Sequence, residues 1–144
     1  MAIYTHILIA VDLTEDSETV GRKAQELAES CGARLSLMHV VEYIPVDPAG
    51  EAMLPPPVNM ESDLLESARK RLDSLADKLQ LSQCDRFVEL GNIKTEITRI
   101  AGEQDVDLIV LGSRERHGLA LLLGSTEKSV LQAAPCDVLA IRLH

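Results

Sequence analysis

Aromatic side chains, closely spaced cysteines and positive charge are all scarce in this chain. Among its 144 residues are one phenylalanine, two tyrosines and no tryptophan, so the core must be built from Leu, Ile, Val and Ala. The three cysteines, Cys31, Cys84 and Cys136, include no CxxC pair, which favours reduced thiols over a disulfide framework. A formal net charge of −9 argues against nucleic acid as an unaided partner.

Long apolar runs are absent too. The most apolar stretch near the start, residues 7–11, is too short for a signal peptide and runs directly into Asp12. No run approaches the length of a membrane span, so we expect a cytoplasmic protein that does not insert into membranes. The length predicts a single domain over residues 1–144.

Five apolar, β-rich segments alternate with four segments of helical periodicity. The predicted strands are residues 3–11, 35–41, 86–90, 107–111 and 137–143. The predicted helices carry their apolar positions within residues 20–31, 64–79, 93–101 and 125–134. This alternation predicts an open, mostly parallel sheet with helices on both faces.

The helix boundaries have several candidate residues. Thr14 or Asp16 can cap the first helix and Gly32 can close it, while Asn59 or Ser62 can cap the second. Residues 42–60 hold five of the six prolines, which predicts a long surface loop. That loop is either a plain connector or a lid over a site at the strand ends.

The residues that carry chemistry follow the predicted fourth strand. An apolar run ends in Gly112, a basic loop with Arg114, Arg116 and His117 follows, and Gly124-Ser125-Thr126 opens a helix. This order is typical of an anion-binding turn, in which free N–H groups at a helix start hold phosphate oxygens. We expect Gly112 to turn the backbone tightly after the strand. In the alternative interpretation, Ser125 is an ordinary helix cap.

Asp12 directly follows the first predicted strand. Ligands of open α/β sheets bind beyond the carboxyl ends of the strands. A carboxylate there accepts hydrogen bonds from a ribose or a base edge, or holds a metal through water. Alternatively, Asp12 is a turn residue that caps the next helix.

Several enzyme classes lack their motifs here. The chain has no GxxxxGK[ST], no GxGxxG after the first strand, no GxSxG and no histidine pair at zinc-ligand spacing. No side chain is therefore a candidate nucleophile or general base, and slow ATP hydrolysis is the most that we expect.

Four stretches together resemble the universal stress protein family. They are Ile7-Leu8-Ile9-Ala10-Val11-Asp12, Leu35-Ser36-Leu37-Met38-His39-Val40, Asp107-Leu108-Ile109-Val110-Leu111-Gly112-Ser113 and Ala134-Pro135-Cys136-Asp137-Val138-Leu139. The resemblance covers essentially the whole chain. It implies a five-stranded parallel sheet of order 3-2-1-4-5, often assembled as a homodimer, in a protein of the stress response.

One branch of that family binds ATP through a G-x2-G-x9-G-[S/T] signature. Gly112 matches its first glycine and Gly124-Ser125 its last pair, but Glu115 stands at the second glycine and the spacer to Gly124 is one residue shorter. The resemblance implies ATP, possibly with magnesium. The predicted nucleotide site comprises Ala10, Asp12, Val40, Leu111, Gly112, Arg114, Gly124, Ser125 and Thr126.

Two functions stay open from the sequence. The first is a regulatory protein that binds ATP and changes its contacts with an unidentified protein partner; the departure at Glu115 leaves weaker binding, or a nucleotide with fewer phosphates, as a variant of it. The second is a dimeric interaction protein whose degenerate glycine loop binds no nucleotide. For either, the apolar, terminal strand 137–143 predicts a homodimer joined antiparallel at a sheet edge.

Overall fold

A computed structural model describes residues 3–42, 58–114 and 126–143 of the chain. Its elements, in chain order, are β1 (His6–Ala10), α1 (Ser17–Cys31), β2 (Arg34–Val41), α2 (Val58–Lys78), β3 (Asp85–Leu90), α3 (Ile93–Glu103), β4 (Leu108–Arg114), α5 (Thr126–Ala133) and β5 (Asp137–Leu143). Most of the predicted proline-rich loop and of the predicted phosphate loop lies outside the described residues.

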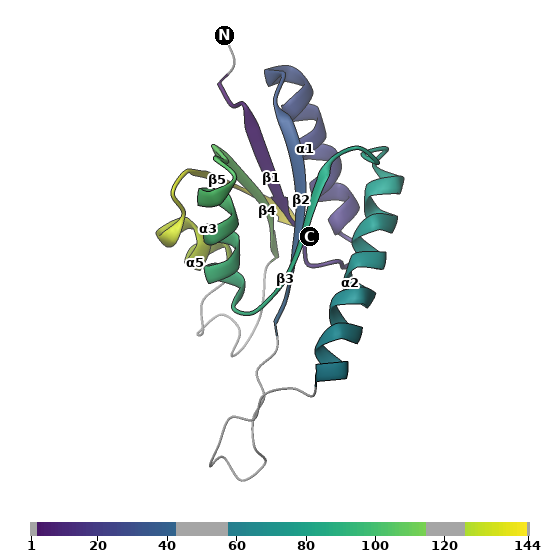
Figure 1. Cartoon of the computed structure of the whole chain (residues 1–144). Coiled ribbons are helices and arrows are strands. Elements are labelled where there is room, and N and C mark those ends of the chain that lie inside the picture. Colours follow the sequence, from purple (N-terminus) through teal and green to yellow (C-terminus); the bar gives the residue numbers. More distant parts are fainter. Residues whose placement is uncertain (1–2, 43–57, 115–125, 144) are drawn as a thin grey trace.

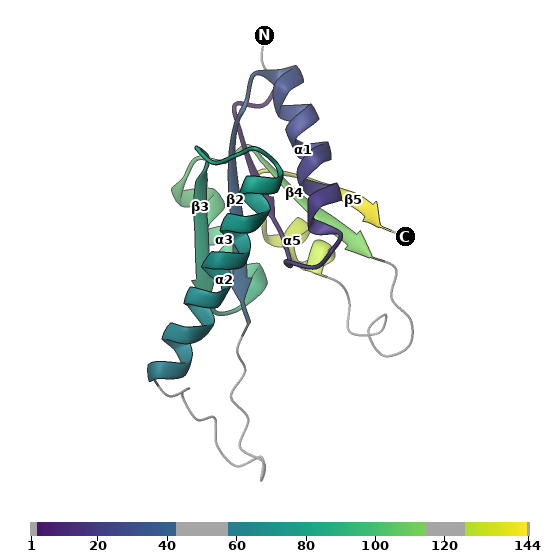
Figure 2. The ribbon, with the colours of Figure 1, turned by 90° about the vertical axis from the view of Figure 1, so that its right-hand side faces the viewer.

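The five strands form one parallel sheet in the order β3-β2-β1-β4-β5. Helices α1 and α2 cover one face of this sheet, and α3 and α5 cover the other (Figures 1 and 2). The predicted fold class and strand order are thereby confirmed. β3 and β5 are the two edge strands of the sheet.

The core explains why the first strand is apolar at successive positions. Ile7 and Ile9 pack toward α1 and α2, whereas Leu8 packs toward α3. All three side chains are fully buried. A strand covered by helices on both faces has no solvent side, so its sequence shows an apolar run rather than alternation.

The helix ends agree with the sequence in part. Gly32 closes α1 in the left-handed conformation, at φ 68°, as predicted. Asp16 occupies the cap position of α1, but its side chain makes no capping hydrogen bond. The predicted caps Asn59 and Ser62 are wrong, because α2 already begins at Val58.

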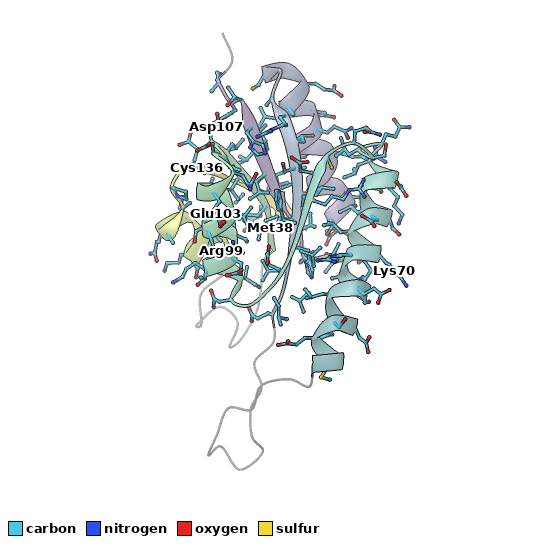
Figure 3. The ribbon with its side chains drawn as sticks, in the orientation of Figure 1. Met38, Lys70, Arg99, Glu103, Asp107 and Cys136 are labelled. Carbon is cyan, nitrogen blue, oxygen red and sulfur yellow. The ribbon has the colours of Figure 1, made fainter. Side chains whose placement is uncertain are left out.

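A polar network ties the amino ends of the central strands together. Asp107 accepts hydrogen bonds from Thr5 N (2.8 Å), Thr5 Oγ1 (2.9 Å) and His6 N (3.0 Å). Burial alone would raise the pKa of Asp107, but these hydrogen bonds outweigh it and lower the pKa. Figure 3 shows Asp107 at the end of the sheet near the N-terminus of the chain, with Met38 farther along the sheet.

His6 is the buried member of this network. Its Nε2 lies 2.7 Å from Ser36 Oγ, and its Nδ1 lies 3.0 Å from both the Gln104 carbonyl oxygen and Arg34 Nη2. Burial, supported by the positive charge of Arg34, lowers the pKa of His6. These surroundings favour the neutral form of the ring.

Candidate functional site

The opposite end of the sheet has a notch, because β1 is shorter than its neighbours. Ala10, the last residue of β1, is in register with Met38 of β2 and Leu111 of β4. β2 then continues to Val41 and β4 to Arg114. Since the chain passes from β1 to β2 on one side while β4 pairs on the other, this notch is the topological switch point of the sheet.

A cavity of about 160 Å³ lies at this notch. Five of the nine predicted site residues line it: Ala10, Asp12, Val40, Leu111 and Gly112. They lie at or just beyond the carboxyl ends of β1, β2 and β4. The sequence predicted this place from the rule that ligands of open α/β sheets bind beyond the carboxyl ends of the strands.

Asp12 stands in the turn that follows β1. Its Oδ1 accepts hydrogen bonds from Thr14 N (3.0 Å), Thr14 Oγ1 (2.7 Å) and Ser17 Oγ (3.2 Å). The carboxylate thus stabilises the turn into α1, which is the role that the alternative interpretation gave it. It also lines the cavity, so the two roles are compatible.

Gly112 does not turn the chain, contrary to the expectation from the sequence. It lies within β4 and pairs with Ile141 of β5. The reason for a glycine is close packing instead. A Cβ atom at this position would lie 2.7 Å from Leu143 Cδ1 and 3.1 Å from Val20 Cγ2. Gly112 therefore lets β5 and α1 close over the end of β4, beside the cavity.

His39 is a lining residue that the sequence reasoning missed. Its Nδ1 lies 2.8 Å from the Val11 carbonyl oxygen. Because a carbonyl oxygen only accepts, Nδ1 carries a proton and donates this hydrogen bond. The bond joins β2 to the residue immediately before Asp12. The alternation of side chains along a strand is enough to predict that His39 faces α1. It does not predict the contact with Val11.

Apolar side chains of α3 complete one wall. Ile93 and Ile97 line the cavity together with Met38, Val40 and Leu111. The ionisable lining residues from the described part of the chain are Asp12, Asp16 and His39. The described cavity therefore offers apolar surface and acceptors, and little positive charge.

Comparison with known proteins supplies the family. The profile of the universal stress protein family matches residues 3–142. The chain belongs to the universal stress protein family. It is 40% identical over 141 residues to universal stress protein A homolog 2 of Coxiella burnetii, covering 97% of this chain and 96% of that protein. Universal stress protein A homolog 1 of the same organism is 38% identical over 138 residues, covering 96% of each chain.

Solved structures agree with the fold. The universal stress protein of Archaeoglobus fulgidus, in complex with dAMP, superposes with a TM-score of 0.63 at 22% identity, covering 96% of this chain and 98% of that one. At this identity the likeness establishes the fold alone.

The remaining predicted site residues of this universal stress protein are only partly described. Arg114 is the last residue of β4, and Thr126 is the first residue of α5. Gly124 and Ser125 lie outside the described residues. Within the described part of the chain, no group of three or more His, Cys, Asp or Glu side chains could hold a metal ion. No described helix is long and apolar enough to cross a membrane.

Proposed function

We propose that this universal stress protein is a cytoplasmic regulatory protein that binds an adenine nucleotide, ATP above all, at the switch point between β1 and β4. The observation that carries the proposal is the cavity at the strand ends, which five of the predicted site residues line. Ligands of open α/β sheets bind at this place. The complex of the Archaeoglobus relative with dAMP supports the same class of ligand.

The described cavity suits the nucleoside half of such a ligand. Val40, Ile97 and Leu111 offer apolar surface for a purine ring, and a carboxylate at Asp12 can accept hydrogen bonds from ribose hydroxyls. Asp12 and Asp16 repel phosphate, so the phosphates need the Gly124-Ser125-Thr126 segment and the basic residues of the loop. Glu115 adds negative charge to that loop, which favours weaker ATP binding or a nucleotide with fewer phosphates.

Calorimetric titration of nucleotide-stripped protein with ATP and magnesium, and separately with AMP, tests the proposal. We expect saturable binding of both. Gly124→Asp places bulk and negative charge at the predicted phosphate position, so it should abolish ATP binding and weaken AMP binding less. If Gly124→Asp titrates like the parent protein, the phosphate position is wrong.

A dimeric interaction protein that binds no nucleotide is the second candidate. One observation favours it: Asp12 Oδ1 already accepts three hydrogen bonds within its own turn, as expected of a purely structural residue. Absence of heat and of thermal stabilisation with ATP and with AMP would support this candidate.

Both candidates include a homodimer. β5 is an edge strand, and Leu139 within it is 41% exposed. An unpaired edge with exposed apolar side chains favours pairing with a second strand. We propose that two copies join along residues 137–143 in an antiparallel manner.

A further inference from the structure

We infer that Arg71 is a positioning residue for the candidate nucleotide site: from α2 it holds Leu13 in a left-handed backbone conformation and so fixes the Asp12 turn. The part of this inference that concerns affinity rests on the proposed function. The part that concerns the turn does not, because it follows from the conformation of Leu13 and its contacts.

Leu13 has an unusual backbone. Its φ is 60°, in the left-handed region that a side chain with a Cβ atom disfavours. The other non-glycine residues with positive φ in the described chain are Gln80 and Asp105. Each lies two residues after the last residue of a helix, where the left-handed conformation is a common way for a helix to end. Leu13 instead lies between β1 and α1, so the surrounding structure must hold it there.

Burial of its side chain and a hydrogen bond from α2 hold Leu13 in place. Its side chain is 9% exposed and packs in the core cluster that contains Leu72 and Leu75. Its carbonyl oxygen accepts a hydrogen bond of 2.6 Å from Arg71 Nη2. Figure 1 shows the turn between β1 and α1 running toward α2. A charged donor on a carbonyl makes a stronger hydrogen bond than a neutral one.

The hydrogen bond from Arg71 matters because of where Leu13 lies in the chain. Leu13 stands between Asp12, which lines the cavity, and Thr14, whose N–H and hydroxyl both donate to Asp12 Oδ1. A change of φ at Leu13 therefore moves Thr14 relative to Asp12 and breaks the turn. On the other side, His39 holds the Val11 carbonyl. Arg71 and His39 thus fix the two residues that flank Asp12.

A double-mutant cycle tests the inference. Arg71→Ala should weaken AMP binding about tenfold, the size expected for loss of a charged hydrogen bond. Glycine adopts positive φ without strain, so Arg71→Ala made in a Leu13→Gly protein should cost roughly threefold or less. If loss of the buried Leu13 side chain unfolds the Leu13→Gly protein, the amide exchange of Thr14 described below decides the inference instead.

Lys78→Ala is the matched control. Lys78 lines the same groove as Arg71 and Leu13 and carries the same charge, without the bond to Leu13. We expect its AMP affinity to equal that of the parent. If Arg71→Ala and Lys78→Ala lose the same AMP affinity, the effect comes from the lost positive charge. If Arg71→Ala costs the same AMP affinity with and without Leu13→Gly, the effect comes from a general loss of stability. Either result overturns the inference.

Hydrogen exchange of the Thr14 amide separates this inference from the proposed function. Arg71→Ala should accelerate that exchange, because the amide loses its fixed partner at Asp12, and Lys78→Ala should not. This readout needs no nucleotide. If the parent protein binds neither AMP nor ATP, the proposed function fails, and Thr14 exchange alone decides: faster exchange in Arg71→Ala supports the positioning role, and unchanged exchange refutes it.

Discussion

At the scale of single residues, two glycines differ in the space around them. Gly112 lies in close contact with neighbouring side chains, whereas Gly102 has open space beside it. A Cβ atom at Gly112 would crowd Leu143 and Val20, whereas a Cβ atom at Gly102 on α3 meets nothing within 4 Å. The same substitution at the two positions should therefore have opposite effects. Sequence reasoning identified Gly112 as special but assigned it a turn, because a glycine after an apolar run also fits the end of a strand.

Gly112→Ala should lower the free energy of unfolding by about 1–3 kcal/mol, the usual cost of overpacking. Gly102→Ala should raise it by about 0.5–1 kcal/mol, because alanine is the better helix former. Chemical denaturation of both variants and the parent measures the difference. Equal effects of the two substitutions would show that Gly112 does not sit in the close contact described.

His6 makes stability depend on pH. The pKa of His6 in the fold is lower than its ordinary value of 6.5, so as pH falls the unfolded chain takes up a proton before the folded one does. The free energy of unfolding should therefore decrease as pH falls below 6.5. Denaturation across this range should give a steeper decrease for the parent than for His6→Gln. Parallel pH profiles would refute a buried neutral His6.

Strands and helices are the scale at which the sequence is most informative. The apolar runs predicted all five strands, and most clearly β1, whose successive residues Ile7, Leu8 and Ile9 are buried on both faces of the sheet. The sequence determines the ends of the strands and helices less well. β4 continues past Leu111 to Arg114 since β5 pairs with it throughout, and α2 begins at Val58 without the predicted polar caps. Such boundaries depend on neighbours that are distant in sequence.

The edge strand β5 carries the prediction at this scale. Leu139→Lys adds two like charges to the proposed antiparallel interface and should convert a dimer into a monomer at the same concentration, measured by sedimentation. Met60→Lys is the control, because Met60 is 46% exposed on α2, the helix that packs against β2 and β3. A monomeric parent at micromolar concentration, or a dimeric Leu139→Lys protein, would refute pairing through β5.

Charged side chains on the helices contribute little to this picture. Arg99 of α3 pairs with Glu103 at 2.6 Å and Glu96 at 2.8 Å, and Figure 3 shows Arg99 and Glu103 together on that helix. Lys70 points away from α2 and pairs only loosely with Glu66, at 3.7 Å. Exposed pairs of this kind stabilise a fold weakly, so they mark solvated faces rather than sites.

At the scale of the whole molecule, two polar groups of residues lie at opposite ends of the sheet. His6 and Asp107 stabilise the amino end, and the cavity beside Asp12 and His39 occupies the carboxyl end. The sequence predicted a site at the carboxyl end from the rule for open α/β sheets, from Asp12 and from the glycines of the loop after the fourth strand. It could not predict His39, Ile93 or Ile97 as lining residues, because their place depends on how β2 and α3 pack beside β1.

Titration of isotope-labelled, nucleotide-stripped protein with AMP, followed by backbone amide NMR shifts, tests the central claim most directly. We predict saturable shifts at Val11, Val40 and Gly112 around the cavity, with His6 and Asp107 at the opposite end of the sheet unchanged. Absence of saturable shifts, or shifts confined to residues away from the cavity, would contradict a nucleotide site at the switch point.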